Sequence, residues 1–208
     1  MPLNHPATDV WTLLTDVADE IPGAPAFIHG ARTISFAELQ DAAERTAKGL
    51  SDLGIGPGDR VALWLPNVPA YPILYFACVR LGAVAVAVNT RYRAVEVADI
   101  VGRSGAKILA CMPGFRRIDF LSILADIDPA ALDKLTALVT VGEEGTTLPA
   151  VSARLRCVNF DRLLSRPRLA TNNARPNMPC NVFTTSGTTS APKFVLHRQG
   201  AIASHAQQ

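Results

Sequence analysis

The side chains best suited to chemistry lie in residues 184–193, which read Thr-Thr-Ser-Gly-Thr-Thr-Ser-Ala-Pro-Lys and are called here the hydroxyl-rich loop. The hydroxyl groups near its centre belong to Thr185, Ser186, Thr188, Thr189 and Ser190. Gly187 divides them into two groups, and Lys193 ends the segment. Hydroxyls and backbone N–H groups are directional donors, and lysine adds a mobile positive charge. Such a loop can wrap the tail of a di- or triphosphate.

Two other interpretations of the hydroxyl-rich loop compete with a phosphate site. A solvated turn rich in Ser and Thr is a common connection between strands, and composition does not exclude it. A Walker-type loop has the same separation between Gly187 and Lys193, but it needs a glycine where Pro192 stands and Ser or Thr where Phe194 stands. The residues after Lys193 are typical of a strand, whereas a Walker loop opens a helix. The sequence therefore excludes the Walker interpretation and leaves the solvated turn open.

The elements expected around this loop alternate between strands and helices. Apolar runs of strand length are found at 26–28, 33–34, 60–65, 83–88, 107–111, 137–141, 155–158, 182–183 and 194–196. Helical spacing of apolar residues is found at 9–21, 35–53, 70–81, 95–104, 120–127 and 160–164. Asp9 and Ser35 are expected as N-caps, and Glu38 completes a capping box with Ser35. This order predicts an α/β fold built from βαβ layers on a parallel sheet.

Charge and composition exclude several classes of protein. The 208 residues carry 20 Lys and Arg against 18 Asp and Glu, so no excess of positive charge marks a nucleic-acid binder. An apolar content of 49% excludes intrinsic disorder. The most apolar stretch, residues 70–88, is interrupted by Pro72, Arg80 and Gly82, which makes it a poor membrane span.

The four cysteines, Cys78, Cys111, Cys157 and Cys180, are too far apart in sequence for a local metal-ligand pair. We expect all four to be small buried hydrophobes in a reducing compartment. The first residues lack the basic start and apolar run of a signal peptide. Together these features predict a cytoplasmic protein.

The hydroxyl-rich loop closely resembles the signature of the adenylate-forming (AMP-binding) superfamily, whose usual form is Tyr/Phe-Thr-Ser-Gly-Thr-Thr-Gly-x-Pro-Lys-Gly-Val. Residues 185–189, Pro192, Lys193 and Val195 match that signature position by position. Further blocks resemble the N-terminal part of the family in the same order, at 35–39, 56–62, 65–67, 81–84 and 104–107. Asn89-Thr90-Arg91-Tyr92 is similar to a variant common in acyl- and aryl-CoA synthetases. The chain is thus identified as resembling the N-terminal portion of an acyl-CoA synthetase.

The resemblance implies a two-step ligase reaction. A carboxylate attacks the α-phosphorus of ATP and releases pyrophosphate, and a thiol, most often that of coenzyme A, then displaces AMP. By the same resemblance, the residues that hold the β- and γ-phosphates and their Mg²⁺ are Thr185, Ser186, Gly187, Thr188, Thr189 and Lys193. The Asn89-Thr90-Arg91 variant suggests a fatty or aromatic acid as substrate, in keeping with fatty acid metabolism. No catalytic residue and no metal ligand is assigned within the chain.

Several residues depart from the family or invite a role of their own. Ser190 and Phe194 replace family glycines, and Phe194 packs in the core or borders the substrate channel. His197 comes two positions earlier than the family histidine and is interpreted as a packed or surface residue. Trp64, Tyr71 and Tyr75 are expected to pack helix against sheet, and Asp59 and Arg60 to end a strand turn. Arg91 and Arg93 stand at a strand end, which often faces a crevice in open α/β sheets, but solvated surface charge is the default interpretation of both.

The expected organisation has three parts: an α/β subdomain over 1–164, a connector over 165–181, and a strand–loop–strand over 182–208 that opens the next subdomain. Family members are more than twice as long, so the rest of the active site is expected beyond Gln208, and this chain alone is expected to be inactive. The alternative is a truncated, non-catalytic α/β module with at most residual phosphate binding or a partner-binding role. We expect no nucleic-acid partner and no membrane span, and leave a homodimer open.

Overall fold

The computed structural model describes residues 8–116, 118–142, 154–185 and 192–207. The helices are α1 (Val10–Glu20), α2 (Phe36–Asp52), α3 (Ala70–Leu81), α4 (Ala94–Ser104), α5 (Phe120–Ala125), the 3-10 helix η1 (Pro129–Leu132), α6 (Phe160–Leu164) and α7 (Gln199–Ala206). The strands are β1 (Pro25–His29), β2 (Arg32–Ser35), β3 (Arg60–Trp64), β4 (Val84–Ala87), β5 (Ile108–Cys111), β6 (Ala137–Thr140), β7 (Arg156–Asn159), β8 (Pro179–Thr185) and β9 (Lys193–Arg198). The predicted alternation of strands and helices is confirmed.

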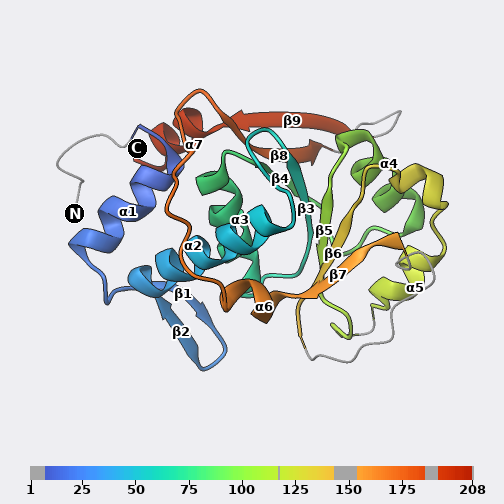
Figure 1. The fold of residues 1–208 in the computed structure, drawn as a ribbon, viewed down its shortest axis with the longest axis horizontal. Helices are drawn as coiled ribbons and strands as arrows, with labels where there is room; N and C mark the ends of the chain where they lie inside the picture. The colour runs from blue at the N-terminus through green and yellow to red at the C-terminus, as the bar shows by residue number, and fades with distance from the viewer. Residues whose placement is uncertain (1–7, 117, 143–153, 186–191, 208) are drawn as a thin grey trace.

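Seven of the strands form one sheet in the order β7-β6-β5-β3-β4-β8-β9. Neighbouring strands from β7 to β8 are parallel, and only the β8–β9 pair is antiparallel. β1 and β2 form a separate antiparallel hairpin. In Figure 1 this hairpin stands apart from the seven-stranded sheet. The predicted parallel sheet is therefore confirmed, with one antiparallel strand added at the edge.

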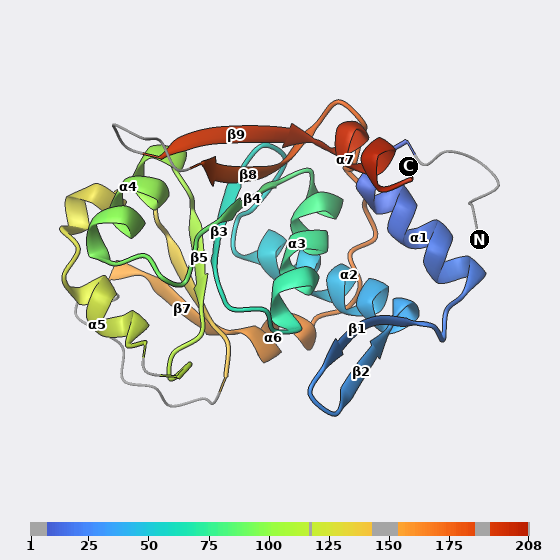
Figure 2. The same cartoon turned by 180° about the vertical axis from the view of Figure 1, so that it is seen from behind.

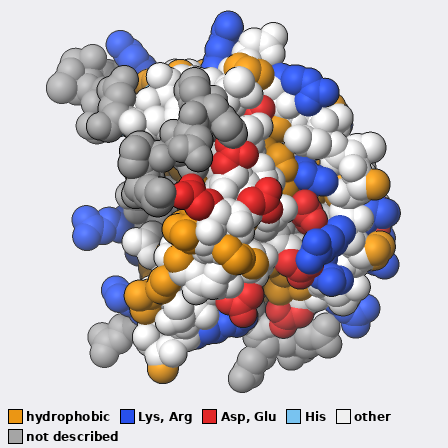
Figure 3. All heavy atoms as spheres, turned by 90° about the vertical axis from the view of Figure 1, so that its left-hand side faces the viewer, with side chains coloured by type: hydrophobic (Ala, Val, Ile, Leu, Met, Phe, Trp, Pro, Cys, Tyr) orange, Lys and Arg blue, Asp and Glu red, His pale blue; other side chains and the backbone are white. Residues whose placement is uncertain are grey.

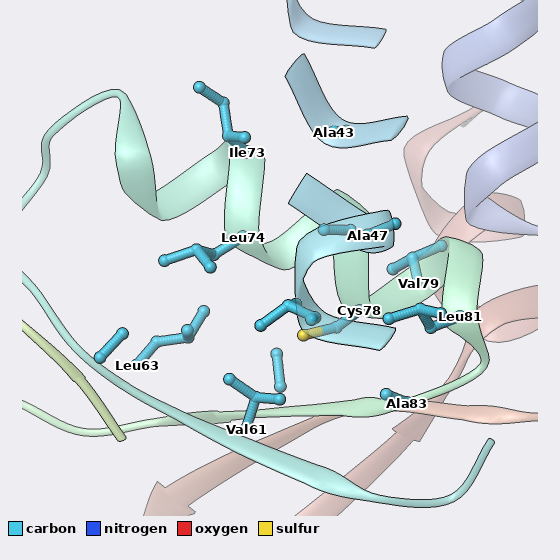
Figure 4. Packing of buried hydrophobic residues seen from close by; sticks show 14 of the residues in the cluster. Ala43, Ala47, Val61, Leu63, Ile73, Leu74, Cys78, Val79, Leu81 and Ala83 are labelled. Carbon is cyan, nitrogen blue, oxygen red and sulfur yellow. The ribbon is translucent and has the colours of Figure 1, made fainter. Parts of the chain in front are cut away.

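Helices cover both faces of the sheet, as a parallel sheet requires. Figures 1 and 2 show α1, α2, α3 and α6 on one side and α4 and α5 on the other. Each side has its own core of buried side chains. Figure 4 shows the first core, where Ala43 and Ala47 of α2 face α3, and Cys78 of α3 lies toward Val61 and Leu63 of β3.

Local sequence signals fix the ends of several helices. The Asp9 carboxylate accepts a hydrogen bond from the Thr12 backbone N–H at 2.8 Å, which caps α1. At α2 the Ser35 hydroxyl accepts from the Glu38 N–H, and the Glu38 carboxylate accepts from the Ser35 N–H. Both predicted N-caps and the predicted capping box are confirmed. These bonds satisfy N–H groups that have no partner inside the helix.

Two expectations differ from the structure. The strand predicted at 182–183 begins at Pro179, because Pro is tolerated at the first position of a strand and Asn181 pairs with Ala85 of β4. Cys157 is exposed rather than buried, because it lies on β7, the edge strand of the sheet. Cys78, Cys111 and Cys180 are buried as expected. The division of the chain into domains stays a prediction.

The surface shows no single dominant charge on the side drawn in Figure 3. There, acidic and basic side chains lie among apolar ones. Among the residues that the structure describes, no helix is long and apolar enough to cross a membrane. Large apolar side chains that remain exposed include Phe183, Val195 and Leu196, all on the β8–β9 hairpin.

Candidate functional site

The candidate site lies at the carboxyl-terminal edge of the parallel strands. β3, β4, β5 and β8 run in the same direction, so the segments that follow them meet at one edge of the sheet. A polar cleft of about 670 Å³ opens there. It is lined by residues 65–68, 87–92, 115–116 and 183–184, with His29 and Tyr71. Open α/β sheets bind ligands in a crevice at this edge.

Hydrogen bonds hold the segment after β4 in the wall of the polar cleft. The indole N–H of Trp64, a fully buried residue, donates to the Asn89 carbonyl oxygen at 3.1 Å. The Asn89 side-chain oxygen accepts from the Arg91 N–H at 2.9 Å. The hydroxyls of Tyr92 and Thr184 lie 3.4 Å apart, which links this segment to β8. The wall is therefore fixed from inside the sheet.

The three arginines of the polar cleft region differ in role. Arg93 donates to the carbonyl oxygens of Arg91 and Tyr92 at 2.9 and 3.0 Å, so it folds the loop rather than facing a ligand. Arg91 and Arg116 line the cleft and are exposed. Among the described residues, neither guanidinium has an ion-pair partner. Two unpaired positive charges in one cleft favour an anionic ligand.

Arg116 also has an unusual backbone conformation. Its φ of 56° makes it the one non-glycine residue with positive φ among the described residues. A side chain in this region costs about 1–2 kcal/mol. Its guanidinium lies 5.1 Å from the centre of the Phe115 ring, another residue of the polar cleft. Strain of this kind is often found at functional sites.

The first residue of the hydroxyl-rich loop lies in the polar cleft, and its last residue lies across the strand ladder from Thr185. Thr184 lines the cleft, Thr185 ends β8, and Lys193 begins β9 directly opposite Thr185 in the ladder. Thr185 and Lys193 are both exposed. The remaining predicted phosphate ligands, Ser186, Gly187, Thr188 and Thr189, lie outside the described residues, as does Ser190. The structure thus brings together the first and last predicted ligands, Thr185 and Lys193, at the edge where the parallel strands end.

A second cavity, of about 540 Å³, adjoins the polar cleft and is mainly apolar. It is lined by Tyr71, Tyr75, Asn181, Phe183, His197, Ala201, Ile202 and His205. Tyr71 and Phe183 line both this apolar cavity and the polar cleft, so the two spaces adjoin. Burial raises the pKa of Tyr71 and of Tyr75, which keeps both phenols protonated.

Two other polar side chains, those of His197 and Asn181, line the apolar cavity. The His197 ring meets the Phe183 ring edge-on at 5.4 Å between centres, so His197 is packed, as expected. Asn181 is 6% exposed, and its side-chain oxygen has no hydrogen-bond partner among the described residues. A ligand with a donor group could satisfy that oxygen.

The structure also tests the predictions made for single aromatic residues. Trp64 packs in the core against Phe120, with ring centres 4.4 Å apart, which confirms its structural role. Phe194 packs against the second core, on the side of α4, so of the two expectations for it the core is the one observed. Tyr71 and Tyr75 pack against the first core and also line cavities, which their spacing did not indicate.

Several residues of the polar cleft had no prediction. Phe115 and Arg116 follow β5, so their place at a strand end was a usable signal. His29 comes from the β1–β2 hairpin, and nothing in its sequence neighbourhood points to the cleft. Among the described residues, no group of three or more His, Cys, Asp or Glu side chains could hold a metal ion.

Comparison with known proteins agrees with this fold. Residues 14–208 match the family described as AMP-binding enzyme. A propanoyl:CoA ligase from Mycobacterium tuberculosis, whose acyl group carries a methyl-dioxo-octahydroindenyl substituent, is 34% identical over 200 residues, which cover 89% of this chain and 36% of the relative. The long-chain-fatty-acid–CoA ligase FadD13 from the same species is 30% identical over 197 residues, covering 93% of this chain and 36% of the relative.

Solved structures give the same architecture. The acetoacetyl-CoA synthetase from Streptomyces lividans superposes with a TM-score of 0.81 at 24% identity, over 95% of this chain and 31% of that structure. At that identity the likeness shows the fold alone. The chain spans about a third of the length of the curated relatives it matches.

Proposed function

The chain belongs to the AMP-binding enzyme family, and on that premise we propose that the protein carrying it joins a small carboxylic acid to coenzyme A through an acyl-adenylate. In the first step a carboxylate oxygen attacks the α-phosphorus of ATP, and the bond to the β-phosphate oxygen breaks, releasing pyrophosphate. In the second step the coenzyme A sulfur attacks the acyl carbon, the bond to AMP breaks, and the thiol proton passes to solvent. A carboxylate needs this activation because its own leaving group is too poor.

The observation that carries the proposal is that Thr185 and Lys193 lie opposite each other in the β8–β9 ladder, directly after Thr184, which lines the polar cleft. Negative charge grows on pyrophosphate as it leaves, and donors placed there beforehand lower the barrier. The Lys193 ammonium and the Thr185 hydroxyl would hold the phosphate oxygens together with the predicted Ser186, Gly187, Thr188 and Thr189. Arg91 and Arg116 would add positive charge on the other wall of the cleft.

Mg²⁺ is proposed to enter with ATP and to be held with the β- and γ-phosphates at the hydroxyl-rich loop, as the resemblance implies. When bound, it would neutralise charge on the phosphate oxygens. The role of this chain is to supply hydrogen-bond donors around the phosphate oxygens.

The adjoining apolar cavity supports a fatty or aromatic acid as substrate. It has room for a group of several carbon atoms, and three aromatic rings, those of Tyr71, Tyr75 and Phe183, line it. Because Tyr71 and Phe183 also border the polar cleft, an acid with its carboxylate at that boundary would place its apolar part in the cavity. Apolar burial of this kind is worth about 0.8 kcal/mol per CH₂ group.

The test is pyrophosphate exchange into ATP by the natural full-length protein, with short, long-chain and aromatic carboxylic acids as substrates. We expect exchange that requires Mg²⁺ and a carboxylic acid, and that is faster with the apolar acids. Thr188→Ala and Lys193→Ala are expected to slow it. Binding of ATP without exchange for any acid would favour the non-catalytic module, and unchanged exchange in both variants would remove the loop from the mechanism.

A further inference from the structure

Arg103, near the end of α4, contacts the residues on both sides of Lys193. Its Nη2 donates to the Pro192 carbonyl oxygen at 2.7 Å. Its guanidinium lies 4.4 Å from the centre of the Phe194 ring. Both contacts join residues that are far apart in the sequence, and both fall on the described residues that end the hydroxyl-rich loop.

Asp99, one turn earlier on α4, orients this guanidinium. The Asp99 carboxylate accepts from Arg103 Nε and Nη2, each at 2.7 Å, in a two-point ion pair. A planar guanidinium held at two points has little freedom left to turn. The direction in which Arg103 meets Pro192 and Phe194 is thereby fixed by α4.

The packing of Phe194 shows on which face of β9 Lys193 lies. Successive side chains of a strand point to opposite faces. Phe194 packs on the α4 side of the sheet, so Lys193 is directed to the other side, the side of its ladder partner Thr185. A slip of one residue would turn Lys193 to the wrong face. Arg103 opposes such a slip, because it holds the backbone before Lys193 and the ring after it.

We propose that Arg103 is a positioning residue for Lys193 in adenylate formation, an inference that rests on the proposed function. Arg103 does not touch the reacting groups. It keeps the Lys193 ammonium directed at the phosphate oxygens, with Asp99 and Phe194 as its supports. A residue that orients a reactive group typically changes the rate by about tenfold or more when it is lost.

Arg45 on α2 offers a matched control. It forms an ion pair at the same spacing, with Asp41 one turn earlier, through a single hydrogen bond at 2.8 Å, and donates to a distant carbonyl oxygen, that of Arg166, at 3.1 Å. The exposed fractions of the two arginine side chains are similar, 38% for Arg45 and 45% for Arg103. Arg45 supports a segment away from the hydroxyl-rich loop, so Arg45→Ala should leave pyrophosphate exchange unchanged.

The experiment measures exchange and thermal unfolding in the natural full-length protein. We expect Arg103→Ala to lower kcat/KM for MgATP roughly tenfold and to leave KM for the carboxylic acid unchanged. Arg103→Lys keeps the charge but loses the planar group, so it should lie between Ala and the natural residue. The double variant Arg103→Ala/Lys193→Ala should be no slower than Lys193→Ala alone, because Arg103 acts through Lys193.

The possible results separate this inference from the function on which it rests. If the natural protein shows no exchange with any carboxylic acid, the proposed function fails. If the natural protein exchanges and Lys193→Ala leaves the rate unchanged, the function stands and Lys193 has no part in it. If Lys193→Ala slows exchange while Arg103→Ala behaves like Arg45→Ala, the positioning role is wrong and the function stands. Equal losses for MgATP and for the acid, with a lower unfolding temperature, would make Arg103 a structural residue only. Phe194→Ala gives a second measurement, with a loss expected in the same direction as for Arg103→Ala.

Discussion

The two edges of the parallel sheet use similar residues in different ways. At the amino-terminal edge, Arg60 donates to the carbonyl oxygens of Ser104 and Gly105 at 2.7 and 2.9 Å. Asp59 accepts from the Gly56 N–H at 3.0 Å and pairs with Lys107 at 2.7 Å. This agrees with the expectation that Asp59 and Arg60 end a strand turn. At this edge Asp59 and Lys107 pair with each other, and Arg60 is bonded to backbone carbonyl oxygens.

At the carboxyl-terminal edge, corresponding groups face open space. Arg91, Arg116 and Lys193 are exposed, and the first two line the polar cleft. Backbone strain is divided in the same way. Positive φ falls on glycines at both edges, such as Gly58 and Gly105 at one and Gly114 at the other, where it costs little, and only the carboxyl-terminal edge also has it at a described non-glycine residue, Arg116. The comparison indicates that one edge stabilises the fold and the other is kept for a ligand.

The largest effect is expected when a lysine is removed from each edge in turn and the rates of pyrophosphate exchange are compared. Lys193→Ala at the carboxyl-terminal edge should slow pyrophosphate exchange by about 10²–10³-fold, the usual loss for one donor to a developing negative charge. Lys107→Ala at the amino-terminal edge removes the same charge from a paired position and should leave the rate per folded molecule unchanged. Exchange rates of the two full-length variants decide it. Equal losses would mean that the two edges do not differ in function.

The second prediction concerns stability. Here we expect the larger effect at the amino-terminal edge, in contrast to the exchange rate. Arg60→Ala leaves three carbonyl oxygens, those of Gly58, Ser104 and Gly105, without this donor, so the free energy of unfolding should fall by about 1–3 kcal/mol. Arg91→Ala at the carboxyl-terminal edge should change it by less than about 0.5 kcal/mol, because the Arg91 side chain is exposed. Urea unfolding of both variants measures the difference. A larger loss for Arg91→Ala would show that this arginine has a structural partner.

The third prediction uses pH at the amino-terminal edge. Burial raises the pKa of Asp59, but hydrogen bonds from Lys107 and the Gly56 N–H, with the charges of Lys107 and Arg60, outweigh it and leave the pKa below its usual value. The stabilisation is therefore present at neutral pH and is lost as the pH falls through the lowered folded-state pKa. Asp59→Asn should be less stable than the natural protein at pH 7, and the gap should close below about pH 3.9, the ordinary Asp value.

Unfolding midpoints of the natural protein and of Asp59→Asn, measured across this pH range, give the test. Lys107→Met is the control, since it removes the main partner of Asp59 and should flatten the pH dependence. A gap that stays constant with pH would show that the Asp59 charge contributes nothing and that only its hydrogen bond with Gly56 matters.

Sequence reasoning succeeded where the signal was local. The capping box of Ser35 and Glu38 depends on residues three positions apart, and the strand end at Arg91 follows from the apolar run before it. It failed where pairing with a distant strand decides the structure. Pro179 and Asn181 have the composition of a connector, yet pairing of Pro179 with Arg198 of β9 and of Asn181 with Ala85 of β4 makes them part of β8.

In the candidate site, too, local motifs were predictable and contacts between distant segments were not. Lys193 and Thr185 came from a motif, and the structure places them opposite each other. The contacts of Arg103 with Pro192 and Phe194, and the entry of His29 into the polar cleft, depend on packing between segments far apart in the chain. No spacing along the sequence could indicate them.

The smallest expected effect concerns the strain at Arg116. Replacing Arg116 by Gly removes a strain of about 1–2 kcal/mol but adds about 0.5–1 kcal/mol of unfolded-chain entropy. The two terms nearly cancel, so Arg116→Gly should raise the free energy of unfolding by less than about 1.5 kcal/mol, or leave it unchanged. Gly105→Ala is the matched change at the other edge. It introduces a side chain where φ is 61° and a Cβ would lie 2.6 Å from Arg60, so it should destabilise the protein.

Measurements of activity show whether the strain at Arg116 serves the site. The strained backbone at Arg116 holds a positive charge in the polar cleft. If that charge binds ATP, Arg116→Gly should weaken MgATP binding while the free energy of unfolding stays the same or rises. Arg116→Lys keeps a positive charge at the same φ and should retain most of the binding. A variant Arg116→Gly that is both more stable and fully active would show that the strain has no use in the site. Unfolding in urea and the KM for MgATP, measured on the same full-length variants, separate these outcomes.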